Sequence, residues 1–134
     1  APSAMNRQEW TFVVLSDAEK TARLASVMAT ALGREDYDMY RPAAAILVAH
    51  KKGAAFGRED DGCALQTMFL VAHSLGIGSV WINQLQGICD EPAVRAELTA
   101  LGVPEDAEVH GICALGYATA DGIAHERTSQ VVWA

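Results

Sequence analysis

The sequence is poor in cysteine, in basic residues and in long apolar runs, and each scarcity excludes a class of protein. Its three cysteines, Cys63, Cys89 and Cys113, form no Cys-x-x-Cys pair, so the pattern of a disulfide framework is missing. Ten Lys and Arg residues against 17 Asp and Glu give a formal charge of -7, which argues against a nucleic-acid partner. No apolar run approaches the roughly 20 residues that cross a bilayer, and we expect a soluble protein.

Signals for targeting, metal binding and acyl transfer are scarce as well. The sequence does not open with a basic segment followed by an apolar one, so the cytoplasm is the expected location. No two histidines lie four residues apart on a predicted helix, and we expect no metal site. There is no Gly-x-Ser-x-Gly motif. Cys63 and Cys113 fall in apolar segments and are predicted to be core thiols, whereas Cys89, beside a loop, is predicted to be more reactive.

The length of 134 residues suits one domain with one hydrophobic core, and we assign residues 1–134 to it. Apolar periodicity predicts strands at 10–16, 43–49, 79–83, 109–117 and 128–133. Helices are predicted from a Ser16 capping box to Gly33, from Asp60 or Asp61 to about Leu75, and from Asp90 to Leu101. This order indicates an α/β (α+β) protein, an α-β sandwich with a mixed sheet of about five strands flanked by helices. The strands on either side of the long helix are predicted to pair in parallel.

The helix predicted to follow Asp61 is apolar on almost every side. Its only polar stripe pairs Gln66 with His73 and Thr67 with Ser74. A helix of this kind must be buried nearly all round. We therefore expect a second subunit to supply part of that burial. The stretch before the helix, residues 50–61, is predicted to be a mobile loop.

The amino-terminal segment presents polar groups where a loop enters the first predicted strand. Pro2 restrains the backbone, while Ser3, Asn6 and Gln8 carry hydroxyl and amide groups that both donate and accept. A flavin ring edge has this mixed demand, because its N3 donates while its carbonyl oxygens and N5 accept. The alternative is a turn closed by Asn and Ser in front of an edge strand, which local composition alone favours.

Four motifs, in order along the chain, resemble the FMN-dependent nitroreductase family. They are Pro-Ser-x-x-Asn-x-Gln-x-Trp-x-Phe at 2–12, Asp-Gly-Cys-Ala-Leu-Gln at 61–66, Ala-His-Ser-Leu-Gly-Ile-Gly-Ser-Val-Trp-Ile at 72–82, and the strand at 109–117 with its closing Leu-Gly-Tyr. The resemblance implies a nitroreductase-type sandwich, a homodimer and bound FMN. It also implies hydride transfer from NAD(P)H to a nitroaromatic, a quinone or a similar small acceptor by a ping-pong mechanism. The chemistry would take place on the flavin, so no side chain is needed as an acid or base.

The resemblance further implies which residues bind FMN. These residues are Pro2, Ser3, Asn6, Gln8, Trp81, Ile82, Asn83, Gln84, His125 and Arg127. The first four correspond to the loop at the ring edge, and the next four to a segment whose backbone amides face N5. The last two correspond to a Lys-x-Arg pair that holds the phosphate; alternatively, they are solvated loop residues. Many relatives carry Glu-Gly where this sequence has Asn83-Gln84.

Relatives also carry an Arg-Ser-x-Arg segment before the first motif, whose basic side chains hold the flavin phosphate and the N1–O2 edge. The sequence begins at Ala1, directly before that motif. The comparison predicts an amino-terminally truncated fragment, with a short natural form and weakened flavin binding as the alternative. A second functional hypothesis follows, in which the chain is a non-catalytic dimerisation or ligand-binding module that has lost FMN.

Overall fold

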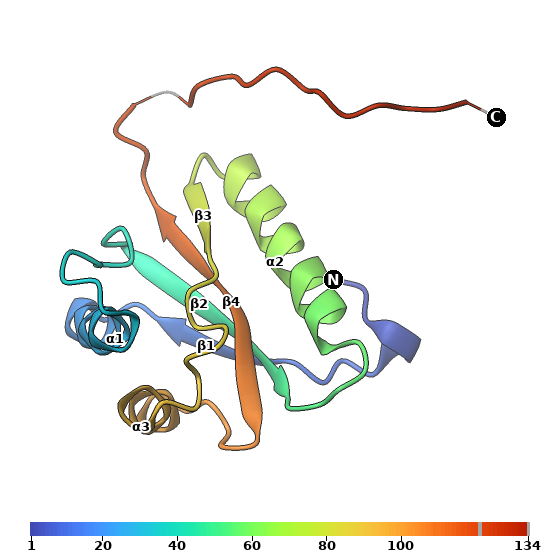
Figure 1. Cartoon of the computed structure of the whole chain (residues 1–134). Helices are drawn as coiled ribbons and strands as arrows, with labels where there is room; N and C mark the ends of the chain where they lie inside the picture. Colours follow the sequence, from blue (N-terminus) through green and yellow to red (C-terminus); the bar gives the residue numbers. More distant parts are fainter. Residues whose placement is uncertain (121, 134) are drawn as a thin grey trace.

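The computed structural model describes residues 1–120 and 122–133. Its strands form one antiparallel sheet in the order β1-β2-β4-β3, with β1 at Thr11–Leu15, β2 at Ala44–Lys51, β3 at Gly78–Ile82 and β4 at Ala107–Gly116. Helices α1 (Ala18–Leu32) and α3 (Pro92–Ala100) cover one face, and α2 (Gly57–Ser74) covers the other (Figure 1). A short 3-10 helix, Ala4–Asn6, precedes β1.

Alternate residues of the central strands enter two separate hydrophobic layers. In β2, Leu47 packs in the layer of α1 and α3, while Val48 packs in the layer of α2. In β4, Ile112 and Cys113 divide in the same way. Successive side chains of a strand point to opposite faces, so both strands are covered on both sides. The uninterrupted apolar run at 43–49 predicted this arrangement.

The α-β architecture is as predicted, but two expectations about the sheet are wrong. β2 and β3 run in the same direction, yet the long strand β4 lies between them and pairs antiparallel with both. The sheet is therefore antiparallel rather than mixed. Residues 128–133, predicted as a fifth strand, are extended and exposed. Their apolar pattern shows only that the segment could pair with another strand. Within the described part of the chain, it does not lie beside an edge strand of the sheet.

The amino-terminal end of α1 differs from the predicted capping box. Asp17, rather than Ser16, is the N-cap, and its carboxylate accepts hydrogen bonds from the backbone N–H groups of Glu19 and Lys20 at 2.9 and 3.2 Å. At the other end Gly33 adopts the left-handed conformation, with φ 62°, and it ends the helix as predicted.

Asp17 and Ser16 give a direct test of the cap. Asp17→Ala is expected to lower the free energy of unfolding by about 1 kcal/mol, because two backbone N–H groups lose their acceptor. Ser16→Ala, the matched control, is expected to change it by less than about 0.5 kcal/mol. Urea denaturation monitored by circular dichroism measures both. A larger loss of unfolding free energy for Ser16→Ala than for Asp17→Ala would show that Ser16 is the N-cap, as the predicted capping box requires.

Helix α2 begins at Gly57, about one turn earlier than predicted from Asp60 or Asp61. A side chain at Gly57 would be crowded, since an added Cβ would lie 3.1 Å from His50 Cδ2. Because β2 extends to Lys51, the predicted loop shrinks to residues 52–56. Asp60 and Asp61 are consequently buried inside the helix, with exposures of 6% and 0%.

The three cysteines are distributed differently from the prediction. Cys113 is buried, as expected, and burial raises the pKa of its thiol to about 11. Cys63 instead lies on an exposed side of α2. Cys89 is buried and donates to the Leu85 carbonyl at 3.2 Å, and burial raises its pKa. A thiol with a raised pKa forms little thiolate, so the prediction of a reactive Cys89 is wrong.

Candidate functional site

The amino-terminal segment forms a tight turn against the start of α2. Ser3 Oγ accepts a hydrogen bond from the Gln8 backbone N–H at 3.1 Å, and Gln8 Nε2 donates to Asn6 Oδ1 at 2.8 Å. Asn6 and Gln8 both have φ of 54°, a left-handed conformation that asparagine tolerates. The backbone N–H of Ala4 donates to Asp60 Oδ1 at 2.8 Å. The turn is thus closed internally and tied to α2 by one carboxylate.

The turn brings together the four predicted residues of this segment. Pro2, Asn6 and Gln8 are exposed, and Ser3 is half-buried. Within residues 1–120 and 122–133, Asn6 Nδ2 and Gln8 Oε1 make no hydrogen bond. One is a donor and the other an acceptor, and neither is charged. Arg7 lies between them and is exposed; it was missed at the sequence level because the motif assigns that position no role.

Trp81 and Ile82, at the end of β3, point to opposite faces of the sheet. Ile82 is fully buried in the layer of α1 and α3, so only its backbone is available to a ligand on the α2 side. Trp81 remains 44% exposed and packs against Phe69 of α2, with ring centroids 6.0 Å apart. Its indole also covers Gly111 of β4, where an added Cβ would lie 2.7 Å from the indole nitrogen.

Asn83 and Gln84 form the loop after β3, and Gln86 holds that loop. The Asn83 backbone N–H donates to Gln84 Oε1 at 3.0 Å. Gln86 Nε2 donates both to Asn83 Oδ1, at 2.6 Å, and to the His110 carbonyl, at 2.9 Å. Gln86 therefore ties the loop to β4. Nothing in the sequence singled out Gln86, because its partner on β4 is 24 residues away.

The structure does not bring His125 and Arg127 to the other predicted residues. After β4 the chain continues as an extended, exposed segment that leaves the body of the molecule (Figure 1). Among the described residues, no hydrogen bond or ion pair joins either side chain to the amino-terminal turn. Their assignment as a phosphate-binding pair stays a prediction.

A buried carboxylate with two histidines lies beneath the turn. Asp61 Oδ2 is 2.6 Å from His110 Nδ1, and Asp61 Oδ1 is 3.2 Å from His50 Nδ1. The three side chains come from α2, β4 and β2, and each residue is at most 4% exposed. The hydrogen bond to Asp61 raises the pKa of His110 above its ordinary value of 6.5, although burial opposes the shift. Sequence analysis missed this group because its members are far apart in the chain.

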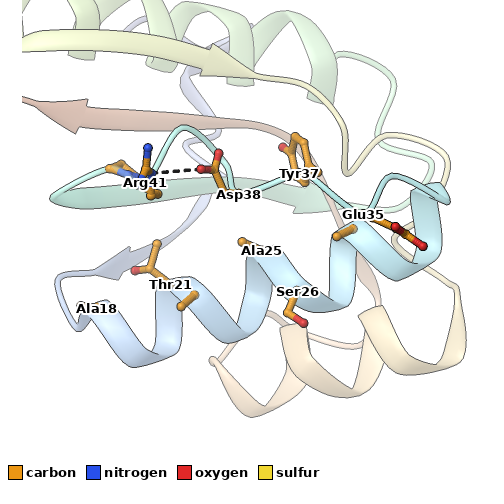
Figure 2. A pocket seen from close by; sticks show the side chains of 11 residues that line it. Ala18, Thr21, Ala25, Ser26, Glu35, Tyr37, Asp38 and Arg41 are labelled. Carbon is orange, nitrogen blue, oxygen red and sulfur yellow. Dashed lines mark ion pairs between the residues drawn. The ribbon is translucent and has the colours of Figure 1, made fainter.

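A cavity of about 510 Å³ lies on the opposite side of the sheet. It is bounded by α1 and the segment at 34–42, and Asp38 and Arg41 at its rim form an ion pair of 3.1 Å (Figure 2). Since α1 and α2 cover different faces, this cavity is separate from the amino-terminal turn. No group of histidines, cysteines and carboxylates suited to a metal ion occurs among the described residues, and none of their helices has the length and apolar character to cross a bilayer.

Comparison with known proteins identifies the family. Residues 32–117 match the model described as "Nitroreductase family". The chain belongs to this family. Its α-β sandwich is accordingly that of a nitroreductase, which confirms the resemblance carried by the sequence motifs.

Individual nitroreductase relatives are similar over most of the chain. A protein of Archaeoglobus fulgidus named "Putative NADH dehydrogenase/NAD(P)H nitroreductase" is 33% identical over 124 residues, which are 87% of this chain and 66% of the relative. The crystal structure of a nitroreductase with bound FMN from Bacteroides fragilis has a TM-score of 0.87 and 36% identity, covering 97% of this chain and 76% of that one. An FMN-dependent nitroreductase from Clostridium difficile has a TM-score of 0.76 and 27% identity, covering 94% and 73%. The chain thus spans just under two thirds of the curated relative's length.

Proposed function

We propose that the chain is an FMN-dependent oxidoreductase that transfers hydride from NAD(P)H to a nitroaromatic, a quinone or a similar small acceptor by a ping-pong mechanism. The observation that carries the proposal is the uncharged amide turn of Asn6 and Gln8, held in place in a member of the nitroreductase family. The FMN-bound relative from Bacteroides fragilis, which is similar over 97% of the chain, supports it.

The residues of the site fit a flavin by the chemistry of their donors and acceptors. A flavin ring edge needs a neutral acceptor for N3–H and donors for its carbonyl oxygens. Gln8 Oε1 and Asn6 Nδ2 supply one of each, and neither has a partner among the described residues. A carboxylate in either place would repel the carbonyl oxygens and the electron-rich reduced ring. The donor set therefore suits a flavin better than it suits a cation.

Each residue of the site has a binding or positioning role in this proposal. Asn6 and Gln8 hold the ring edge, Ser3 fixes the turn through its bond to the Gln8 N–H, and the backbone of residues 81–84 approaches from β3. Trp81 provides an apolar surface that excludes water. Arg7, exposed in the turn, and the predicted pair His125 and Arg127 are the candidates for the phosphate. When bound, FMN supplies the redox chemistry, and the protein contributes position and electrostatics.

Steady-state kinetics tests the activity. With FMN present, the protein is expected to oxidise NADH or NADPH only when an acceptor is supplied, and double-reciprocal plots at several acceptor concentrations are expected to be parallel. Intersecting lines would contradict the ping-pong mechanism. A folded protein that takes up FMN but oxidises neither nicotinamide would contradict the choice of electron donor.

A non-catalytic module that has lost FMN is the second candidate. The segment that carries His125 and Arg127 is extended and leaves the body of the molecule (Figure 1), which favours this candidate, because a phosphate with fewer basic partners is held more weakly. The two candidates differ in one result. The module is expected to keep its secondary structure and to show neither flavin binding nor NAD(P)H oxidation.

We also propose that the protein is a homodimer built on the outer face of α2. Leu70 and Val71 on this helix and its C-cap Leu75 are 61%, 53% and 67% exposed, although the apolar sequence of the helix indicates burial. In the extended segment, Val132 and Trp133 are likewise 84% and 92% exposed. Apolar side chains concentrated in this way mark a protein interface.

Leu70→Glu is expected to convert the dimer to a monomer, because the interface would bury an unpaired carboxylate at a cost of several kcal/mol. Tyr40→Glu is the matched control, since Tyr40 is 65% exposed but lies in the segment between α1 and β2. It is expected to leave the dimer intact. Sedimentation velocity distinguishes the two states. A wild-type protein that is monomeric at micromolar concentration would contradict the proposed interface.

A further inference from the structure

The buried Asp61 is balanced only by its two histidine neighbours. Asp61 is fully buried, and the described residues place no Lys or Arg side chain in an ion pair with it. An ionised carboxylate only accepts hydrogen bonds, so each imidazole donates its Nδ1–H to it. A buried charge that loses such partners costs several kcal/mol. The Asp61 cluster, meaning Asp61 with His50 and His110, is therefore held together strongly.

A β-bulge turns His110 toward Asp61. Across β2 and β4, Val48 pairs with Gly111 and Ala49 pairs with Val109, so His110 is the extra residue on β4 and has no partner in the β2 register. Bulges of this kind re-aim a side chain and are common beside functional sites. Here the bulge lies at the position of β4 whose side chain contacts Asp61, in the second turn of α2.

The Asp61 cluster lies between the two halves of the proposed flavin site. On one side the neighbouring residue Asp60 binds the Ala4 N–H at 2.8 Å. On the other side the His110 carbonyl accepts from Gln86, which also binds Asn83. The amino-terminal turn and the Asn83 loop make no hydrogen bond to each other within the described residues. They are connected through α2 and β4, the elements that Asp61 and His110 join.

We propose that the Asp61 cluster is the positioning element of the flavin site, which fixes the amino-terminal turn relative to the Asn83 loop. The inference rests on the proposed function, because the ligand it positions for is FMN. Asp61 itself contacts no ligand in this account. It acts by fixing the spacing between Asn6 on one side and the backbone of residues 81–84 on the other.

The hold of the cluster depends on pH through His110. Two carboxylates face His110 directly: Asp61 from α2, and Glu108 from β4, whose Oε1 lies 3.1 Å from His110 Nε2. His50 from β2 contacts the other oxygen of Asp61. Glu9 lies on the far side of His50, with its Oε2 3.9 Å from His50 Nε2. The contact with Asp61 raises the pKa of His110 in the folded state. The stabilisation that this contact gives the folded protein is fully present below pH 6.5, the ordinary pKa of histidine. It is lost as the pH rises through the raised pKa of His110 in the folded state. FMN affinity is expected to fall over the same interval.

Asp61→Asn tests the proposal, with FMN as the titrant and flavin fluorescence as the signal. The variant is expected to bind FMN at least 10-fold more weakly at pH 6.5 and to lose the pH dependence. Hydrogen exchange of the Ala4 amide, measured without FMN, is expected to be at least 10-fold faster. Val94→Ala is the control, because Val94 is also fully buried but lies on α3 across the sheet. It is expected to destabilise the protein while changing the FMN Kd by less than 2-fold.

His110→Asn gives a second measurement in case Asp61→Asn does not fold. The asparagine amide can replace the Nδ1–H donor to Asp61 but cannot titrate. Because this amide is uncharged, like the deprotonated imidazole, FMN affinity is expected to be weakened already at pH 6.5, to about the value that the wild type reaches at high pH, with no further fall as the pH rises. A pH profile identical to that of the wild type would overturn the role of His110.

Two results would overturn the role of the cluster. In the first, Asp61→Asn and Val94→Ala destabilise the protein equally and both leave the FMN Kd and the Ala4 exchange rate unchanged. In the second, the wild type binds no FMN and Ala4 exchange is the same in Asp61→Asn. If the wild type binds no FMN but exchange at Ala4 is accelerated, the proposed function fails and the positioning of the turn stands.

Discussion

Gly111→Ala is expected to lower the free energy of unfolding by about 2–3 kcal/mol, in the range that overpacking of a core costs. An added Cβ would lie 2.5 Å from Leu65 Cδ1 and 2.7 Å from the Trp81 indole nitrogen. Leu65 of α2 is fully buried, whereas Trp81 is 44% exposed, so we expect Trp81 to move. The same variant is therefore expected to weaken FMN binding. Urea denaturation and the fluorescence of the tryptophans measure the two effects.

Gly116→Ala is the control on the same strand. At Gly116 the closest atom to an added Cβ is the Ala43 backbone nitrogen, at 3.9 Å, which is ordinary contact. The change in unfolding free energy is expected to stay within about 0.5 kcal/mol. Equal destabilisation at the two positions would show that loss of glycine flexibility, rather than crowding at Trp81, is responsible.

Asn6→Asp is expected to weaken FMN binding by about 10- to 100-fold, which corresponds to about 1.5–3 kcal/mol. Aspartate also tolerates the left-handed conformation of this position, and its oxygen can still accept from Gln8 Nε2, which is 2.8 Å away in the wild type. The turn should therefore persist. What changes is that the donor Nδ2 is replaced by a negatively charged acceptor facing the ligand.

Thr99→Asp adds the same charge on α3, across the sheet, and controls for the more negative protein. Its FMN Kd is expected to remain within 2-fold of the wild type. If Asn6→Asp binds FMN as tightly as Thr99→Asp, the amide turn does not contact the ring edge. Riboflavin lacks the phosphate, so its Kd is expected to differ between Asn6→Asp and Thr99→Asp by the same factor as the Kd of FMN, because Asn6 is assigned to the ring.

Local sequence patterns predicted the elements well and their pairing less well. Apolar periodicity located the helices to within about a turn, and Gly33 marked the end of α1. The sheet order could not be read in this way, since it depends on β4 being long enough to pair along both of its edges. The capping pattern at Ser16 failed because Asp17, one residue later, offers a stronger acceptor at the same helix end.

In the site, too, contacts between neighbouring residues were predictable and contacts between distant residues were not. Asn6 and Gln8 were predictable because their bond spans two residues, and a motif records such spacings. Gln86 was not, since its role depends on a carbonyl 24 residues away, and neither was Asp61, whose partner His110 is 49 residues away. Asp61 was predicted as a possible helix cap. As the fifth residue of α2, facing a bulge of β4, it has a different role.

Whether this chain binds FMN is decided by titration of the purified protein, followed by quenching of flavin fluorescence. We expect saturable binding of one FMN per chain, weakened in Asn6→Asp and unchanged in Thr99→Asp. A protein that is folded by circular dichroism and leaves flavin fluorescence unquenched at tens of micromolar FMN would contradict the claim. That result would favour the non-catalytic module instead.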